Sequence, residues 1–129
     1  MTFWRSCFLG VCAALSGCVI GYGHCRFEAP VKINFTGRVH FRSFPARDGI
    51  DNVPVLVLDR TAYIYAPAHS HQCLAADDVQ LVGVSEFPEN IGEDTHVTVE
   101  GSLFEATTAR QHTPFLMSVI IMSPITPAH

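Results

Sequence analysis

Alternation of apolar and polar residues with a period of two is the feature that most restricts how this chain can fold. From Val31 to Thr36, Val, Ile and Phe alternate with Lys, Asn and Thr, and residues 96–104 follow the same pattern. This period is typical of strands with one buried and one exposed face. No segment keeps the 3.6-residue period of an amphipathic helix. We therefore predict an all-β chain, with strands over residues 31–44, 53–59, 62–66, 79–84, 96–104 and 114–122.

The 129 residues provide one small domain, which we place over residues 31–122. Five or six short strands fit either a small OB-like barrel or a β-sandwich. The first strand favours the barrel, because it is long and interrupted by Gly37, with Val39 and Phe41 continuing its inward face. We predict that the other segments are connections or ends: a turn-rich loop over 45–52, a polar loop over 67–76, a turn over 86–92 and a flexible tail over 123–129.

The N-terminus has the layout of a secretory signal, because Arg5 precedes an apolar run over residues 7–15. Leu15-Ser16-Gly17-Cys18 matches the bacterial lipobox, in which signal peptidase cuts before the cysteine and the Cys18 thiol carries diacylglycerol. Acylation of the new amine would complete a stable anchor, since one lipid chain alone binds a membrane only marginally. The predicted boundaries are a signal peptide over 1–17 and a lipid-anchored tether over 18–30.

Val19 follows the lipobox cysteine, so resemblance to enterobacterial lipoproteins implies sorting to the outer membrane, facing the periplasm. Two alternatives remain open. One is ordinary secretion with cleavage nearby, and the other is an uncleaved anchor over residues 6–23, which is short and glycine-rich for a membrane span.

Five cysteines need an explanation. Cys7 and Cys12 would leave with the signal peptide and Cys18 would be lipidated, so Cys25 and Cys73 remain as one pair for an oxidising compartment. We predict a Cys25–Cys73 disulfide, with two unpaired thiols as the alternative.

Metal chemistry has one candidate cluster, His69-Ser70-His71-Gln72-Cys73. Two histidines two residues apart on a strand share a face, and a thiolate would add a third zinc or copper ligand. A Cys73 that forms a disulfide cannot serve as that ligand. We therefore expect no metal and no cofactor, and interpret the segment as an exposed loop.

Catalysis and nucleic-acid binding find little support. The chain has no complete Gly-x-Ser-x-Gly motif and no phosphate-binding glycine loop. The adjacent acidic pairs at 77–78 and 93–94 would point to opposite sides of a strand, so we interpret them as solvated turn charges. Net charge is −4 and Lys32 is the only lysine, which disfavours contact with a phosphate backbone. We predict a protein that is not an enzyme.

Residues 97–119 combine a Val-x-Val-x-Gly-x-Leu-Phe strand, a Thr-rich turn, and His112-Thr113-Pro114 before a final apolar strand. This combination resembles a family of small exported bacterial proteins described only as a domain of unknown function. The resemblance is specific at this hairpin and looser over residues 31–122. Relatives tend to carry a further histidine where this chain has Arg110-Gln111, so a paired-histidine metal site is not implied.

The segment from Thr107 to Pro114 allows two interpretations. Its threonines and His112 could bond the backbone of the turn, which would give them a structural role. Alternatively, the segment is a recognition loop on a rigid scaffold, with contacts from Thr108, Arg110, Gln111 and His112.

Three functions follow as hypotheses. The first is a non-catalytic cell-envelope module that binds a protein or a small ligand, attached to the membrane through its N-terminal lipid. The second is a periplasmic inhibitor or immunity protein, since an acidic surface can steer onto a basic enzyme. The third is a metal-binding protein or hydrolase in which His69, His71 and His112 converge.

Overall fold

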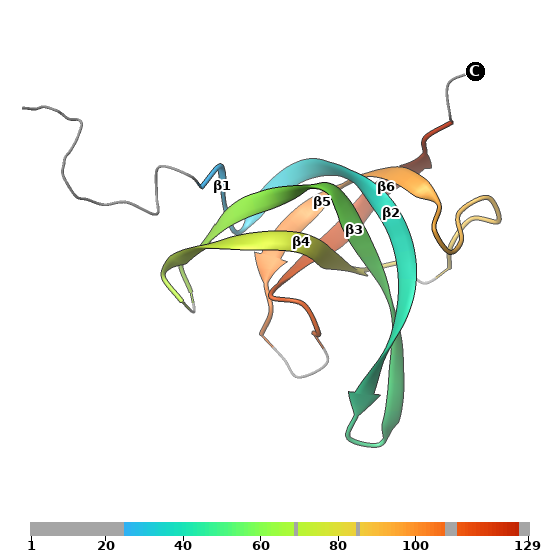
Figure 1. Cartoon of the computed structure of the whole chain (residues 1–129), viewed down its shortest axis with the longest axis horizontal. Helices are drawn as coiled ribbons and strands as arrows, with labels where there is room; N and C mark the ends of the chain where they lie inside the picture. The colour runs from blue at the N-terminus through green and yellow to red at the C-terminus, as the bar shows by residue number, and fades with distance from the viewer. Residues whose placement is uncertain (1–24, 69, 85, 108–110, 127–129) are drawn as a thin grey trace, which may run out of the picture. The chain divides into compact units, whose positions relative to one another are not determined.

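A computed structural model describes residues 25–68, 70–84, 86–107 and 111–126. The predicted signal peptide and Cys18 lie outside these residues. The described part is all-β, as predicted, and has six strands, with none of its residues in a helix (Figure 1). The strands are β1 (Phe27–Glu28), β2 (Val31–Ala46), β3 (Gly49–Ala66), β4 (Gln72–Val82), β5 (His96–Glu105) and β6 (Phe115–Pro124).

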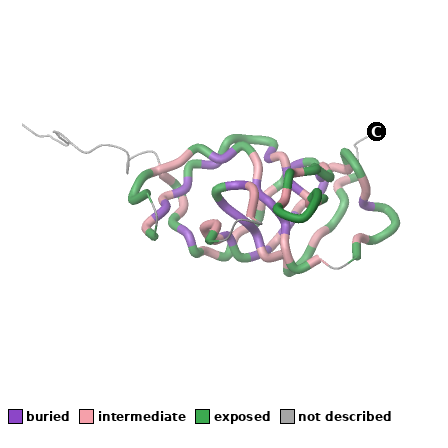
Figure 2. The backbone as a smooth tube through the Cα atoms, turned by 90° about the horizontal axis from the view of Figure 1, so that it is seen from below, coloured by how far each residue is buried: buried purple, intermediate pink, exposed green. Residues whose placement is uncertain are grey.

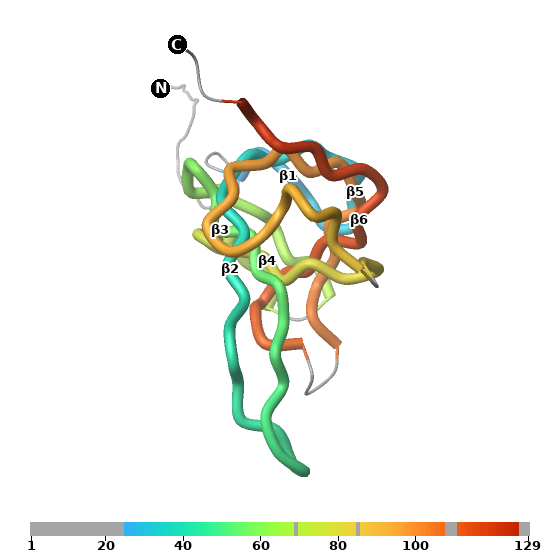
Figure 3. The backbone as a smooth tube through the Cα atoms, turned by 90° about the vertical axis from the view of Figure 1, so that its right-hand side faces the viewer, coloured from blue at the N-terminus to red at the C-terminus, as the bar shows by residue number. Residues whose placement is uncertain are grey.

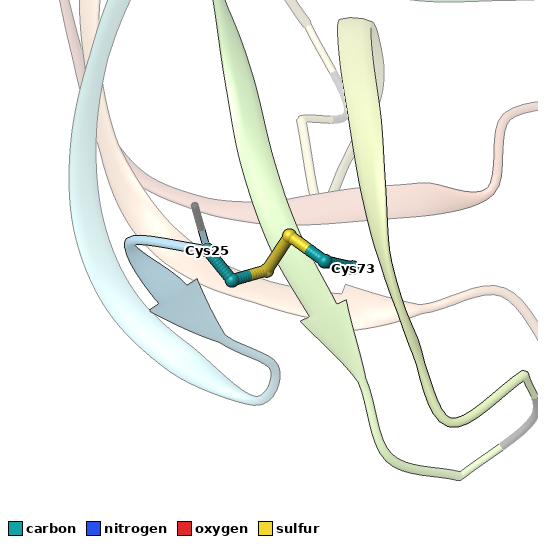
Figure 4. The surroundings of a disulfide bond; sticks show 2 residues. All are labelled: Cys25 and Cys73. Carbon is teal, nitrogen blue, oxygen red and sulfur yellow. A yellow bond between two sulfur atoms is a disulfide. The ribbon is translucent and has the colours of Figure 1, made fainter. Parts of the chain in front are cut away.

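The chain divides into two compact units. The described residues of the first unit are 25–28, 63–68 and 70–74, where β1 pairs in parallel with the end of β3. Cys25 and Cys73 form a disulfide in this unit, with their Cα atoms 5.7 Å apart (Figure 4). The predicted disulfide is therefore confirmed.

The second unit comprises residues 29–62 and 75–126 of the described chain and carries most of the sheet. Its strands are ordered β3-β2-β5-β6-β4, and β3 and β4 also pair, so the hydrogen bonding returns to its starting strand. The pairings are antiparallel except for β4 with β6, where Gln80–Val82 run parallel to Leu116–Ser118. Counting β2 to β6 as one to five gives the ring 1-2-3-5-4-1, which is the order of an OB-type Greek-key barrel.

β2 is a curved strand (Figure 1), and it changes partner at Gly37. Residues 31–38 pair with β5 and residues 37–46 pair with β3, so Gly37 lies opposite both Val97 and Leu58. A Cβ atom at Gly37 would lie 2.2 Å from the carbonyl oxygen of Val57. Only glycine fits this crossing without a shift of the backbone.

The core of the second unit consists of apolar side chains from all of its strands, and the buried residues are distributed along them (Figure 2). Burying one such side chain stabilises a fold by about 1.5–3 kcal/mol. The fully buried members include Val39, Val55, Leu56, Val79, Leu81, Val97, Val99, Leu103, Phe115, Leu116 and Met117.

Several predicted boundaries were wrong. The expected loop over 45–52 is strand except at residues 47–48, and the strands expected over 53–59 and 62–66 are one strand, β3. The expected polar loop over 67–76 is strand from Gln72 onwards. Turn residues mark sites that tolerate a bend, whereas the long ladder between β2 and β3 keeps those residues extended.

The inward face predicted for β2 also ends earlier than expected, since Val39 is buried but Phe41 is 45% exposed. Beyond this point β2 and β3 form a hairpin that extends past β5 and β6 of the same unit (Figure 3). β6 runs to Pro124, so the first two residues of the expected tail belong to a strand. No described residue belongs to a helix long and apolar enough to cross a membrane.

Candidate functional site

The site begins with a histidine that joins two loops. His112 lies in the connection between β5 and β6, and its Nε2 atom is 3.1 Å from Asp51 Oδ2 in the β2–β3 hairpin. The His112 ring stacks on Phe44, with ring centroids 4.3 Å apart and an interplanar angle of 1°. Only 12% of the His112 side chain and 14% of the Asp51 side chain are exposed. His112 therefore holds the β5–β6 loop against Phe44 and Asp51, two facing residues of the hairpin.

A chain of hydrogen bonds fixes the base of the same loop. The backbone N–H of His112 donates to Gln80 Oε1 at 2.8 Å, and the backbone N–H of Gln80 donates to Thr113 Oγ1 at 2.9 Å. The Thr113 hydroxyl donates in turn to the carbonyl of Phe115 at 2.6 Å. Gln80 and Thr113 are both buried, and these bonds satisfy polar groups that would otherwise be costly to bury.

The hairpin has a further contact on the same face. Arg42 NH1 lies 2.7 Å from Asp78 Oδ2 in β4, with the two side chains 42% and 29% exposed. The hairpin is thus fastened at two levels, to β4 through Arg42 and to the β5–β6 loop through His112. The arrangement lies where OB-type barrels contact ligands, which is at the loops joining the first two and the last two strands.

A second polar cluster fastens the loop between β4 and β5 onto β2. Glu93 accepts hydrogen bonds from the backbone N–H of Phe41 at 2.8 Å and from His40 Nδ1 at 2.7 Å. The Phe41 bond, followed by the His40 bond, lowers the pKa of Glu93 below its ordinary value. Arg38 donates to the carbonyl of Asp94, a residue with a φ of 65°.

Asp59 forms a similar link across three strands. His96 Nε2 of β5 lies 2.8 Å from Asp59 Oδ2 of β3. This hydrogen bond is the largest effect on the Asp59 carboxyl, and with a smaller one from Thr36 it lowers the pKa of Asp59. Both histidine–carboxylate clusters are partly exposed and connect separate elements, so the geometry gives them a structural role.

The predicted recognition residues lie partly within this site. Thr108 and Arg110 are outside the described residues. Gln111 lies at the start of the described part, and its side-chain oxygen accepts hydrogen bonds from the N–H and hydroxyl of Thr107. His112 is held between Phe44 and Asp51, so it positions the loop instead of presenting a free ring to a partner.

The residues of the metal hypothesis are not assembled in the described structure. His69 lies outside it, and His71 is exposed, with a φ of 56° and its N–H bonded to the carbonyl of Ala66. Among the described residues, no three His, Cys, Asp or Glu side chains are grouped so that they could hold a metal ion.

The acidic pair at 77–78 was wrongly interpreted as turn charges. Asp77 and Asp78 lie within β4, where Asp77 accepts a hydrogen bond from Thr61 and Asp78 pairs with Arg42. The chain itself gives no sign of these partners, because they lie 16 and 36 residues away.

The sequence also gave no indication of Phe44 and Asp51 as parts of the site. Both lie in a segment expected to be the end of a strand and a loop, and Asp51 is 61 residues from its partner His112. The one local signal was Thr113-Pro114, which marks a stiff exit from the loop.

Residues 78–123 match a family described as Domain of unknown function (DUF4431). The matched segment contains β5, nearly all of β6 and the loop with His112, which is the hairpin on which the resemblance rested. No curated protein and no solved structure matches the chain.

Proposed function

We propose that this chain is a non-catalytic binding module held at the cell envelope by a lipid on Cys18. The observation that carries the proposal is the fastening of the β2–β3 hairpin to the β5–β6 loop by His112, Phe44 and Asp51. These loops occupy the ligand-contacting positions of OB-type barrels. Loops fixed in advance lose little conformational freedom on binding, which leaves more of the contact energy for affinity.

The location rests on two sequence features and one bond. The lipobox Leu15-Ser16-Gly17-Cys18 and the basic residue Arg5 favour export and lipidation. The Cys25–Cys73 disulfide favours an oxidising compartment. We place the protein at the outer membrane, facing the periplasm.

A second candidate is an inhibitor or immunity protein that blocks a toxic enzyme. The projecting hairpin and the net charge of −4 favour it, because an acidic surface attracts a basic enzyme and a rigid arm can occupy its cleft. This candidate is a special case of the binding module in which the partner is an enzyme.

The anchor is tested by metabolic labelling with a palmitate analogue in the cells that produce the protein. The full chain should take up label, and Cys18→Ala should take up none, while Cys12→Ala provides the matched control and should label normally. Unlabelled wild-type protein would contradict the anchor.

Binding is tested by capture on the tagged full chain from an envelope extract at moderate salt. We expect one heterologous protein near a 1:1 ratio, reduced by His112→Ala. An empty eluate from a correctly folded chain would contradict the binding module. Where the captured protein is an enzyme, loss of its activity in the complex would select the inhibitor.

A further inference from the structure

The two faces of the β2–β3 hairpin differ sharply. Residues directly opposite each other in an antiparallel pair share a face. On one face, the pairs Arg42–Val53 and Phe44–Asp51 lie under Asp78 and His112, as described above. The opposite face receives none of these contacts. We call it the hairpin strip, and its three cross-strand pairs are Phe41–Pro54, Ser43–Asn52 and Pro45–Ile50.

The hairpin strip is exposed and apolar for its size. Phe41 is 45% exposed and Ile50 is 68% exposed, and Ser43, Pro45 and Asn52 are exposed as well. None of its six residues is charged. The Ser43 hydroxyl donates to Asn52 Oδ1 at 2.5 Å, which pairs two polar groups at the centre of the strip. Exposed apolar side chains gathered on one face of a small protein mark an interaction site more often than single exposed residues do, and here they lie on both sides of this polar pair.

The strip is held by contacts as well as exposed. Its opposite face is held by His112 and Arg42, and two prolines restrict its backbone. At its base, Phe41 meets the Phe87 ring edge to face, with centroids 5.2 Å apart. A partner that docks here would therefore bind a preformed surface.

An acidic loop contacts the Phe41 end of the strip through Glu93 and Phe87. Glu93 bonds the backbone of Phe41 directly, and Glu86 and Glu89 are exposed on either side of Phe87 in the chain. The loop over residues 86–94 contains four acidic residues and no Lys or Arg. The Phe41 end of the strip therefore attracts positive charge, whereas a second copy of this chain, also of net charge −4, is repelled at long range.

We propose that the hairpin strip docks on a second, basic protein, whose apolar recess receives Phe41 and Ile50 and whose Lys or Arg side chains face Glu86 and Glu89. This inference rests on the proposed binding function and identifies its surface and the class of its partner. Charges at the edge of an interface set the association rate and its salt dependence, while the burial of Phe41 and Ile50 sets the lifetime of the complex.

The test is site-specific photo-crosslinking in the cells that produce the protein. A photoreactive phenylalanine analogue is placed in the full chain at Ser43 or Ile50 of the strip, and at exposed Arg60 of β3 as the matched control. We expect one heterologous adduct at positions 43 and 50 and none at 60, and the cross-linked protein should have an isoelectric point above about 9.

The purified pair then gives a second measurement. Ile50→Ser should weaken the complex about tenfold, since Ile50 is the most exposed large apolar side chain of the strip and loses its apolar contact with the partner's recess. Glu86→Lys with Glu89→Lys should slow association and reduce its salt dependence. Ile50 is largely exposed, so its replacement leaves the melting temperature unchanged and separates binding from folding.

Each other outcome overturns the inference. An adduct with the chain itself would assign the strip to a second copy or to another segment of this chain, and an acidic partner would contradict the charge argument. A heterologous adduct at position 60 with none at 43 and 50 would leave the binding module standing and move its surface elsewhere. No heterologous adduct at any position would contradict the binding function as well.

Discussion

At the scale of single residues, His112 has the largest expected effect. Removing its ring leaves Asp51 partly buried without this partner and removes the stack on Phe44. We expect His112→Ala to lower the free energy of unfolding by about 1–3 kcal/mol, measured by denaturant titration. His71→Ala is the matched control, because His71 is exposed, and it should change stability by less than about 0.5 kcal/mol. Equal effects of the two substitutions would show that the loop is not held by His112.

Two carboxylates predict how stability depends on pH. The pKa of Glu93 is lowered by the Phe41 N–H and His40, and the pKa of Asp59 is lowered mainly by His96. The unfolded chain therefore binds more protons than the folded chain in acid. The stabilisation is complete above the ordinary values of 4.5 and 3.8, and it is lost as the pH falls through the lower folded values.

The measurement is the unfolding free energy between pH 7 and pH 3. The wild type should lose stability below about pH 5, and Asp59→Asn combined with Glu93→Gln should flatten this decline. Glu86→Gln serves as the control and should leave the slope unchanged. A slope that persists in the double variant would assign the acid sensitivity to other groups.

At the scale of the elements, Gly37 allows β2 to pair with both β3 and β5 at the same point. A Cβ at this position would lie 2.2 Å from a backbone oxygen of β3, which cannot move without disturbing the ladder. We expect Gly37→Ala to destabilise the fold by about 2 kcal/mol or more in a denaturant titration. Gly92→Ala is the control, because nothing lies within 4 Å of its added Cβ. A neutral Gly37→Ala would mean that the two strands separate easily there.

The strands show which parts of the fold the sequence could predict. Residues 31–36 and 96–104 alternate cleanly, and both lie in strands. In the second of these strands the inward side chains of Val97, Val99 and Leu103 are buried. The segment over 45–52 misled because its Pro, Gly, Asp and Asn are turn formers, yet it continues two strands. Pro45 and Pro54 lie four residues apart along the ladder, counted by their pairs Pro45–Ile50 and Phe41–Pro54. In an antiparallel ladder every second pair exchanges no backbone hydrogen bonds, so both prolines can occupy such pairs without the loss of a hydrogen bond. Local composition does not reveal this register.

The candidate site was only partly predictable for the same physical reason. His112 is singled out by its place in the loop before Pro114, whereas its partners Phe44 and Asp51 depend on a pairing that only the folded sheet creates. The hairpin strip was hidden as well, because alternation along β2 assigned Phe41 to the core. Phe41 does lie on the same face of β2 as Val39, but beyond Val39 this face of the strand is no longer covered by the core.

At the scale of the whole molecule, the disulfide should contribute strongly to stability. Cys25 and Cys73 are 48 residues apart, and closing a loop of this length stabilises by on the order of 4 kcal/mol in the chain-entropy model. A Cys25→Ser and Cys73→Ser double variant should lose a large part of this stabilisation, measured as the free energy of unfolding in a denaturant titration. Reductant should lower the wild-type midpoint to that of the variant and leave the variant unaffected. Equal midpoints for oxidised wild type and variant would contradict the prediction.

The account depends most on a hairpin that is held in place before any partner binds, and amide hydrogen exchange over residues 40–54 measures this directly. We predict slow exchange at the β2–β3 ladder in the wild type, and faster exchange there in His112→Ala, while Val97 and Val99 stay protected in both. Rapid amide exchange in the β2–β3 hairpin of the wild type, with Val97 and Val99 still protected, would show that the β5–β6 loop does not hold the hairpin in place. This result would contradict the preformed binding surface.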